Sequence, residues 1–423
     1  MLGHSHAQYR PNPSHPRKVD TLTSLPDFKY DSRTVVPIFD EIERTNAAPA
    51  GHGESTYTFL NRVSGEYWDQ VRTLIQDWCA GISDAGEYEQ IRKRFREADN
   101  YEFCSTFLEV YIHECLIRAG FSVTVHPDIP GTERHPDFYA ERDDVRFYLE
   151  AISPTTSKDA RGKAARATQL YDAINMVRSD DFYIWVTSLD VGERTAPGSK
   201  LRKRLEAWLS SLDPDPYADG TQWPVEHWEL DDWKASFKAI PKSANKRGAH
   251  RQAIGVYPAT VQRLDEAPKI VAAVKEKHKA YGDLGCPFVV AVGMYITDTA
   301  KFHASNALYG YLTDEITLSE SGEVIDKRAV RNRTGYFGTP ESWRNPQVSA
   351  VLVVNQLMPY HFQRADIALW KNPGARYGLK EELGLPWPEV IFSAGLKDVV
   401  EHPSPSEFFG IPDEWPIGSP WPV

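Results

Sequence analysis

The sequence lacks the features that mark several classes of protein. Cysteine is scarce, with four widely spaced residues in 423, and no two of them form a CxxC pair. We therefore expect no zinc site, and we expect reduced thiols in a cytoplasmic protein. No apolar stretch is long enough to cross a bilayer, and residues 1–18 lack the apolar segment of a secretory signal. A membrane partner is therefore not expected.

An excess of basic residues is also missing. The chain has 59 acidic residues against 48 lysines and arginines, which gives a formal net charge of −11. Proteins that coat DNA without regard to sequence are normally basic, so this charge argues against a packaging role. It does not argue against a nuclease, which needs only a local basic groove beside an acidic site.

Common motifs of nucleotide-binding and hydrolytic enzymes are absent too. The glycines of GDLGCPF and GTPES neither follow a strand nor open a helix, so we find no phosphate-binding loop and no dinucleotide fingerprint. The segment EVYIHE lacks the second histidine of a zinc protease motif, and no GxSxG occurs. The function must therefore be sought in other residues.

What the chain does contain is enough apolar and aromatic sequence, at 41% and 12%, for two or three packed units. We divide it into an irregular N-terminal arm (1–53), a helical lead-in (54–100), a core (101–190), a basic helix with loops (191–252), an α/β extension (253–370) and a Pro- and Trp-rich tail (371–423). In the lead-in, apolar residues recur at helical spacing from Trp68 to Trp78.

The core segment predicts elements in the order α-β-β-β-α-β. The predicted elements are a helix at 101–119 closed by Gly120, strands at 121–125, 135–141 and 145–152, a helix at 156–179 and a strand at 181–188. Later strands are predicted at 254–261, 287–297 and 348–355. These later strands either extend the core sheet or form an attached subdomain, and the fold class is α/β.

The hairpin within this core brings two acidic residues together. If Asp143 and Asp144 form its two-residue turn, Arg142 pairs with Val145 and Asp137 lies opposite Glu150. The Cβ atoms of directly opposed residues are about 4.5–5.5 Å apart, so the two carboxylates repel each other. A divalent cation removes this repulsion, and Mg²⁺ commonly binds one or two carboxylates.

The HPDF segment at 135–138, Glu150 on the next strand and Glu109 on the preceding helix resemble the PD-(D/E)xK nuclease superfamily, whose restriction-endonuclease-like core has this element order. The resemblance implies metal-dependent hydrolysis of phosphodiester bonds, in DNA more than in RNA, with a role in restriction or phage defence. It implies that Asp137 and Glu150 bind Mg²⁺ or Mn²⁺. The backbone carbonyl of Ala151 would be a further ligand and Glu109 would assist. A homodimer or a partner within a defence system is compatible with it.

One residue departs from the family pattern. The superfamily usually places a lysine two residues after the second acid, where this chain has Ile152. We predict that Lys163, in the following helix, replaces it, although its basic neighbours Lys158, Arg161 and Arg166 also suit a solvated face. If no cation replaces the lysine, the chain is a nuclease-fold module that binds nucleic acid or a partner protein without catalysis. A third alternative is an unrelated α/β protein whose acids pair with surface arginines.

Other residues are candidates for nucleic-acid contacts. His113, one turn after Glu109, either touches a phosphate or is an ordinary core histidine. The basic clusters at 200–204 and 242–251 would line a groove, with Trp223, Trp228 and Trp233 available for stacking on bases. The alternative is that the basic clusters are ordinary solvated surface.

Overall fold

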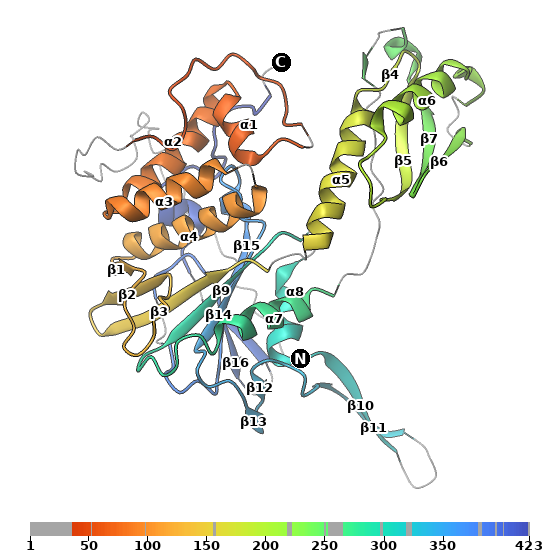
Figure 1. Ribbon diagram of the computed structural model, residues 1–423. Coiled ribbons are helices and arrows are strands. Elements are labelled where there is room, and N and C mark those ends of the chain that lie inside the picture. The colour runs from red at the N-terminus through yellow and green to blue at the C-terminus, as the bar shows by residue number, and fades with distance from the viewer. Residues whose placement is uncertain are drawn as a thin grey trace, which may run out of the picture.

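The protein has a mixed α/β architecture built on an eight-stranded sheet, shown by a computed structural model (Figure 1). The structure describes residues 36–51, 53–97, 99–154, 158–217, 222–248, 251–252, 265–296, 299–318, 324–379, 383–393, 396–400 and 402–421. The strands of the sheet, in spatial order, are β1 (Ser122–Val125), β2 (Phe138–Arg142), β3 (Val145–Ile152), β9 (Phe288–Met294), β14 (Ala350–Asn355), β15 (Asp366–Lys371), β16 (Glu389–Ser393) and β17 (Leu396–Val400).

The sheet is antiparallel at its edges and parallel at its centre. Strands β1, β2 and β3 form an antiparallel meander. Strand β9 then runs parallel to β3, and β14 runs parallel to β9. Strand β15 is antiparallel to β14, β16 is parallel to β15, and β17 closes the far edge antiparallel to β16. The connections from β3 to β9 and from β9 to β14 are long and place helices over the sheet.

Helices cover both faces of the sheet, because its central strands are apolar on both sides. Alternate residues of β9 separate into two cores: Val289 and Ala291 pack toward the N-terminal helices, and Val290 and its neighbours pack toward the other face. The first layer holds α1 (Thr56–Arg62), α2 (Glu66–Ala80), α3 (Ala85–Arg96), α4 (Asn100–Arg118) and the short α9 (Pro405–Phe409). The second holds α7 (Ala267–Lys277) and α8 (Ala300–Tyr309).

Helix α4 is the buried centre of the first layer. Its apolar residues extend around most of its circumference, and it packs between α1–α3 and strands β1 and β3. Asp99 caps its start by accepting a hydrogen bond from the backbone N–H of Tyr101. Its end is closed by Gly120 at φ 83°, with the N–H of Phe121 bonded to the carbonyl of Leu116 at 3.0 Å. This helix presents Glu109 beside the sheet.

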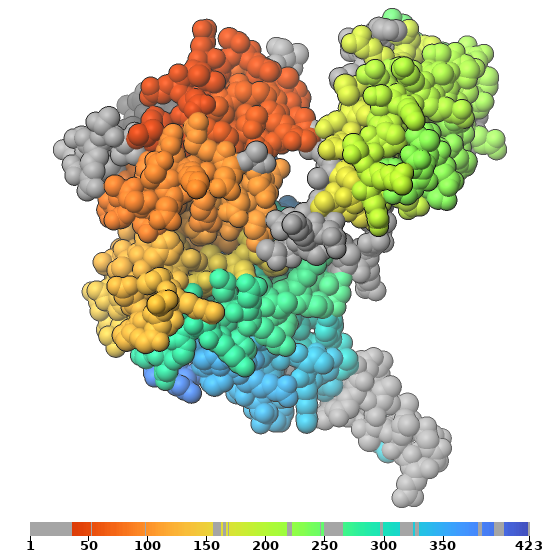
Figure 2. All heavy atoms as spheres, viewed as in Figure 1, coloured from red at the N-terminus to blue at the C-terminus, as the bar shows by residue number. Residues whose placement is uncertain are grey.

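Residues 158–252 form a lobe with its own sheets, which corrects the predicted core. The lobe contains α5 (Lys158–Asn175), β4 (Arg178–Ser179), β5 (Phe182–Asp190), α6 (Gly198–Ser210), β6 (Val225–Leu230), β7 (Trp233–Pro241) and β8 (Arg251–Gln252). Strand β5 joins β7 and β6 in a three-stranded sheet, and it does not pair with the eight-stranded one. Figure 2 shows the lobe in yellow to green as a distinct mass of atoms.

The physical reason for this correction lies in the sequence pattern of the two strands. Phe182, Ile184 and Val186 of β5 are buried and alternate with half-buried residues, as in a sheet covered on one face only. Strand β9 is buried at every position, as a central parallel strand must be. The next strand of the eight-stranded sheet after β3 is therefore β9, which α7 precedes, and the lobe is inserted in the sequence between β3 and β9; the predicted strand at 181–188 belongs to the lobe.

The predicted tail is also part of the fold. Strands β16 and β17 and helix α9 come from residues 371–423, and Trp387 is 2% exposed in the core beneath the N-terminal helices. The remaining elements are β10 (Leu312–Leu318) and β11 (Val324–Arg331), which form a two-stranded ribbon, and the short pair β12 (Gly338–Thr339) and β13 (Ser342–Trp343). The predicted strand at 254–261 and the first 35 residues of the N-terminal arm lie outside the described residues. In the described part of the chain, every helix is too short or too polar to cross a membrane.

The burial of Trp387 makes the C-terminal segment necessary for stability. We expect Trp387→Ala to lower the free energy of unfolding by about 3–5 kcal/mol, because it leaves a large cavity in the core. Urea denaturation measures this change. Ile417→Ala, at a position that is 50% exposed, is the control, with an expected change within about 0.5 kcal/mol. Equal stability of the wild type and both variants would show that the segment is an unattached tail.

Candidate active site

The hairpin of β2 and β3 has the predicted register. Arg142 lies opposite Val145, and Phe138 lies opposite Leu149, so one further step places Asp137 opposite Glu150. Asp137 is fixed from both sides: its Oδ2 accepts a hydrogen bond from the backbone N–H of Ala151 at 2.6 Å, and its carbonyl accepts one from His126 at 3.0 Å. The predicted register is therefore confirmed from Phe138 to Val145, and its continuation by one residue brings Asp137 next to Glu150.

Glu150 is buried, with 4% of its surface exposed, and both of its carboxylate oxygens have partners. Lys277, the last residue of α7, places its Nζ 2.6 Å from Oε1. The hydroxyl of Tyr281 lies 2.5 Å from Oε2 and 3.2 Å from the carbonyl oxygen of His135. A cation and a hydroxyl from the segment just before β9 therefore neutralise and orient the second acid of the hairpin.

The cation that contacts Glu150 is Lys277 and not Lys163, the residue predicted for this position. Lys163 is exposed on α5, a helix of the inserted lobe that packs against α6. Ile152, at the usual position of the lysine, packs against the core under α7 and α8, where an ammonium group would be costly to bury. The cation therefore comes from the neighbouring helix rather than from the strand.

The sequence did carry a signal for Lys277. The segment at 267–281, which contains α7, ends in KEKHKAY and is followed by an apolar strand, PFVVAVGM. If these two elements are taken as the last helix and strand of the core, the lysines of the helix fall beside Glu150. We missed this arrangement because the helix and strand at 156–188 follow the hairpin without a gap in the sequence.

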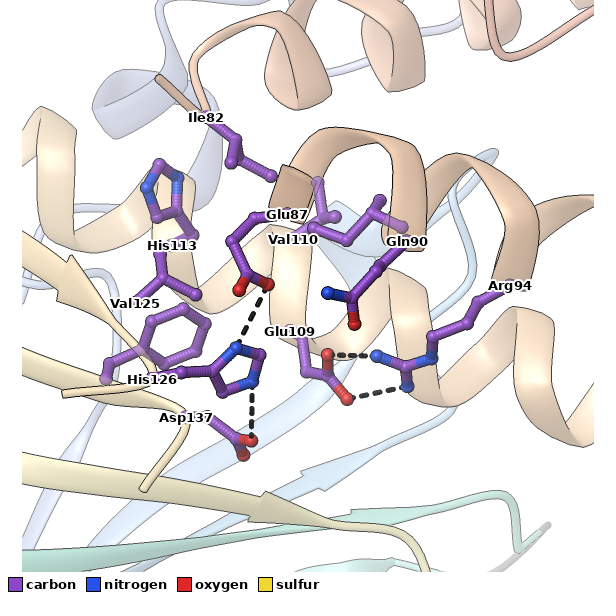
Figure 3. A pocket seen from close by; sticks show the side chains of 12 residues that line it. Ile82, Glu87, Gln90, Arg94, Glu109, Val110, His113, Val125, His126 and Asp137 are labelled. Carbon is purple, nitrogen blue, oxygen red and sulfur yellow. Dashed lines mark hydrogen bonds and ion pairs between the residues drawn. The ribbon is translucent and has the colours of Figure 1, made fainter. Parts of the chain in front are cut away.

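Glu109 lies on the other side of Asp137 and is bound by an arginine. Arg94 of α3 holds it through two hydrogen bonds, of 2.5 and 2.8 Å (Figure 3). Glu109 and Asp137 line a common pocket, whereas Glu150 is not among the residues that line it. Asp137 is therefore close to both other carboxylates, to Glu150 on the hairpin and to Glu109 in the pocket, and we call the three the carboxylate row.

The carboxylate row perturbs the ionisation of Asp137. Burial raises the pKa of Asp137 well above its usual value of 3.8, and the charges of Glu150 and Glu109 raise it further. The N–H of Ala151 and the charge of Lys277 act in the opposite direction. Burial alone would lower the pKa of Lys277, but its hydrogen bond to Glu150 and the nearby charges outweigh burial and raise it. The negative charge of the row is thus only partly compensated.

A histidine connects Asp137 to a fourth carboxylate. His126, held at the unusual φ of 46°, places Nδ1 3.0 Å from Glu87 and Nε2 3.9 Å from Asp137 (Figure 3). The pocket beside it encloses about 30 Å³, which is room for one or two water molecules. His113 lines the same pocket but is 4% exposed, and burial lowers its pKa to about 4, so it is a neutral core histidine.

Two tests outside this geometry give negative results. Among the described residues, no group of three or more histidine, cysteine, aspartate or glutamate side chains is arranged to hold a metal ion. Comparison of the chain with models of protein families, with curated proteins and with solved structures finds no match.

The raised pKa of Asp137 predicts that this residue lowers the stability of the fold at neutral pH and not at acidic pH. A carboxyl group whose pKa is higher in the folded state stabilises the fold fully below pH 3.8 and loses that contribution as the pH rises toward its folded-state pKa. In EDTA at neutral pH, Asp137→Asn should therefore unfold at a higher urea concentration than the wild type. This advantage should shrink on acidification and vanish below pH 3.8. The exposed Asp413→Asn is the control, and an advantage independent of pH would contradict the prediction.

Proposed function

We propose that this protein is a metal-dependent nuclease that hydrolyses phosphodiester bonds, with DNA as its substrate. The observation that carries the proposal is the contact of Lys277 with Glu150, next to Asp137 on the same hairpin. Two acids and a lysine on a restriction-endonuclease-like core are the residues that the PD-(D/E)xK resemblance calls for. Ile152 stands at the usual position of the lysine on the strand, and in this proposal Lys277 of α7 provides the positive charge instead.

The arrangement of the sheet supports the same proposal. With residues 153–266 counted as an insertion, the order α4-β1-β2-β3-α7-β9 matches the α-β-β-β-α-β core of the superfamily. In this interpretation the second acid lies near the end of β3, and the helix that supplies the cation packs over the next strand, β9. The insertion separates the two along the sequence without separating them in space.

The site fits a divalent cation held by two carboxylates. Asp137 and Glu150 are neighbours on the hairpin, and burial together with the charges of Glu150 and Glu109 raises the pKa of Asp137 despite the opposing charge of Lys277. Mg²⁺ needs only one or two protein carboxylates because water and phosphate oxygens complete its shell, so a protein cluster of three ligands is not required. When bound, the metal would activate a water molecule and neutralise charge that develops on the phosphate.

The chain's own residues have distinct parts in this proposal. The N–H of Ala151 and the hydroxyl of Tyr281 fix the orientations of Asp137 and Glu150. The ammonium group of Lys277 lies where it can bind a phosphate oxygen of the substrate and stabilise its negative charge. Arg94 restrains Glu109, so that this acid contributes mainly through its charge. The backbone carbonyl of Ala151 completes the proposed ligands.

One observation favours a second function, a module that binds nucleic acid or a protein without catalysis. Both oxygens of Glu150 and both oxygens of Glu109 already have partners, as in a structural ion-pair network. In that case the carboxylates would bind no metal, and Lys277 would serve only to compensate a buried charge. Cleavage and metal binding discriminate between the two functions.

A cleavage assay tests the nuclease directly. Purified protein is incubated with single- and double-stranded DNA and RNA in Mg²⁺, Mn²⁺ or EDTA. We expect metal-dependent cutting that is lost in Asp137→Ala and Glu150→Ala. Lys277→Ala should be slower by about 100-fold or more, because it removes a charge at the transition state. Lys163→Ala is the matched control and should keep full activity. No cutting by the wild type in any arm would refute the proposal.

Metal binding is measured separately by thermal unfolding. A ligand that binds only the folded state stabilises it by about 2.7 kcal/mol at 100 times its dissociation constant. We therefore expect Mg²⁺ or Mn²⁺ to raise the melting temperature of the wild type and of Lys163→Ala, but not of Asp137→Asn. If the metal raises all three melting temperatures equally, it binds elsewhere and the carboxylates form a structural network.

A further inference from the structure

The inserted lobe has a sheet with one covered face and one open face. On the covered face, Phe182, Ile184 and Val186 of β5 pack with apolar residues of α5 and α6 in a core that belongs to the lobe alone. On the other face, alternate residues of the three strands remain half-buried or exposed. No helix of the described lobe contributes side chains to a core on that side.

Aromatic and apolar side chains gather at one end of the open face. Tyr183 and Trp185 of β5 point outward, and the ring of Trp223 meets that of Trp185 edge-on, with centroids 6.1 Å apart. The register places Tyr183 opposite Ile240, and it places Lys238 between Trp185 and Val225, which is 47% exposed. These side chains form two adjacent rows across the three strands.

Positive charge accompanies the aromatic rings. The Nζ of Lys238 lies 5.3 Å from the centre of the Trp185 ring, and that of Lys242 lies 5.2 Å from the centre of the Tyr183 ring. Lys242 is buried and donates to the carbonyl of Ser179, whereas Lys238 is partly accessible. At the far end of the face, Lys234 is paired with Glu229 at 2.8 Å. The positive charge that can meet a ligand therefore lies at the aromatic end.

The lobe as a whole differs in charge from the rest of the chain. Residues 158–252 hold 16 lysines and arginines against 14 acidic residues, whereas the other residues hold 32 against 45. A polyanion is repelled electrostatically by the acidic remainder of the chain and much less by the lobe. This distribution favours an anionic ligand over a basic partner protein.

The structure also changes which tryptophans are available for stacking. Trp228 and Trp233, two of the three named from the sequence, are buried in the core of the lobe, at 8% and 1% exposure. Of the three, only Trp223 is partly exposed, and Trp185, which lies in the strand predicted at 181–188, joins it on the open face. Both tryptophans are partly exposed, and Lys238 lies beside the ring of Trp185.

We infer that the open face of the lobe binds single-stranded nucleic acid, with bases stacked on Trp185, Tyr183 and Trp223 and with phosphate contacted by Lys238. Aromatic rings on an exposed sheet suit unpaired bases, whose flat faces a duplex keeps covered. The lobe is inserted in the sequence between Glu150 and Lys277, and in this inference it holds the strand on which the site acts. The inference names the substrate form of the proposed nuclease, but binding by this face does not require catalysis.

Binding is tested with fluorescein-labelled oligonucleotides of about 15 nucleotides, a length that covers one stacking surface. Anisotropy is measured in EDTA with the full chain, on single-stranded DNA, single-stranded RNA and the matching duplex. We expect tighter binding to single strands, weakened about tenfold by Trp185→Ala and hardly changed by Trp185→Phe, which keeps an aromatic face. Lys238→Ala should lower the slope of affinity against salt by about 1, because it removes one phosphate contact.

Lys203→Ala is the matched control, because Lys203 is exposed on α6, on the covered side of the same sheet. Thermal unfolding checks that each variant keeps the melting temperature of the wild type. Stronger binding to the duplex, no binding at all, or equal affinities for Trp185→Ala and the wild type would each overturn the inference. Asp137→Ala should bind as the wild type does. Binding to single strands without any cleavage would refute the nuclease and leave this inference standing. Metal-dependent cleavage, with equal binding by the wild type and Trp185→Ala, would support the nuclease and refute this inference.

Discussion

The ion pair between Glu150 and Lys277 is the interaction on which the candidate site depends. Glu150 is buried beside a second carboxylate, and an ionised acid in such a place is stable only if a positive charge compensates it. Compensation comes from α7, which can reach the hairpin only because β9 pairs parallel to β3 and carries α7 over the sheet. The position of the cation therefore requires the parallel centre of the sheet, and with it the three-layer fold.

The positive charges near the site compensate two of its three carboxylates. Lys277 compensates Glu150 and Arg94 compensates Glu109, but Asp137 has no cation of its own within hydrogen-bonding distance among the described residues. The result is a local excess of negative charge at one carboxyl group, fixed by a backbone N–H. A structural ion-pair network gains nothing from that excess, whereas a site for a divalent cation uses it.

How much of this could be predicted from the sequence varies from element to element. The hairpin register followed from Asp143 and Asp144 at the turn, because side chains in a strand alternate strictly and one acid fixes the position of the other. The helix of Glu109 and its glycine end were equally local. The partner of Glu150 was not predicted, because local patterns do not tell which of several later strands pairs with β3. The apolar sequence of β9, buried on both faces, indicated a central strand that could pair with β3. Strand β5 follows β3 sooner in the sequence and was taken for that partner, although it belongs to the sheet of the lobe.

The insertion has a consequence for the order in which the chain becomes functional during its synthesis. Glu150 and Lys277 are 127 residues apart, so at 5–20 residues per second the ribosome needs roughly 6 to 25 s to deliver the lysine after the glutamate. Through that interval the hairpin lacks both its cation and the strand that must pair with β3, while the lobe between them already has a complete core of its own. A nascent chain of this protein would thus have a folded lobe before it has a complete site.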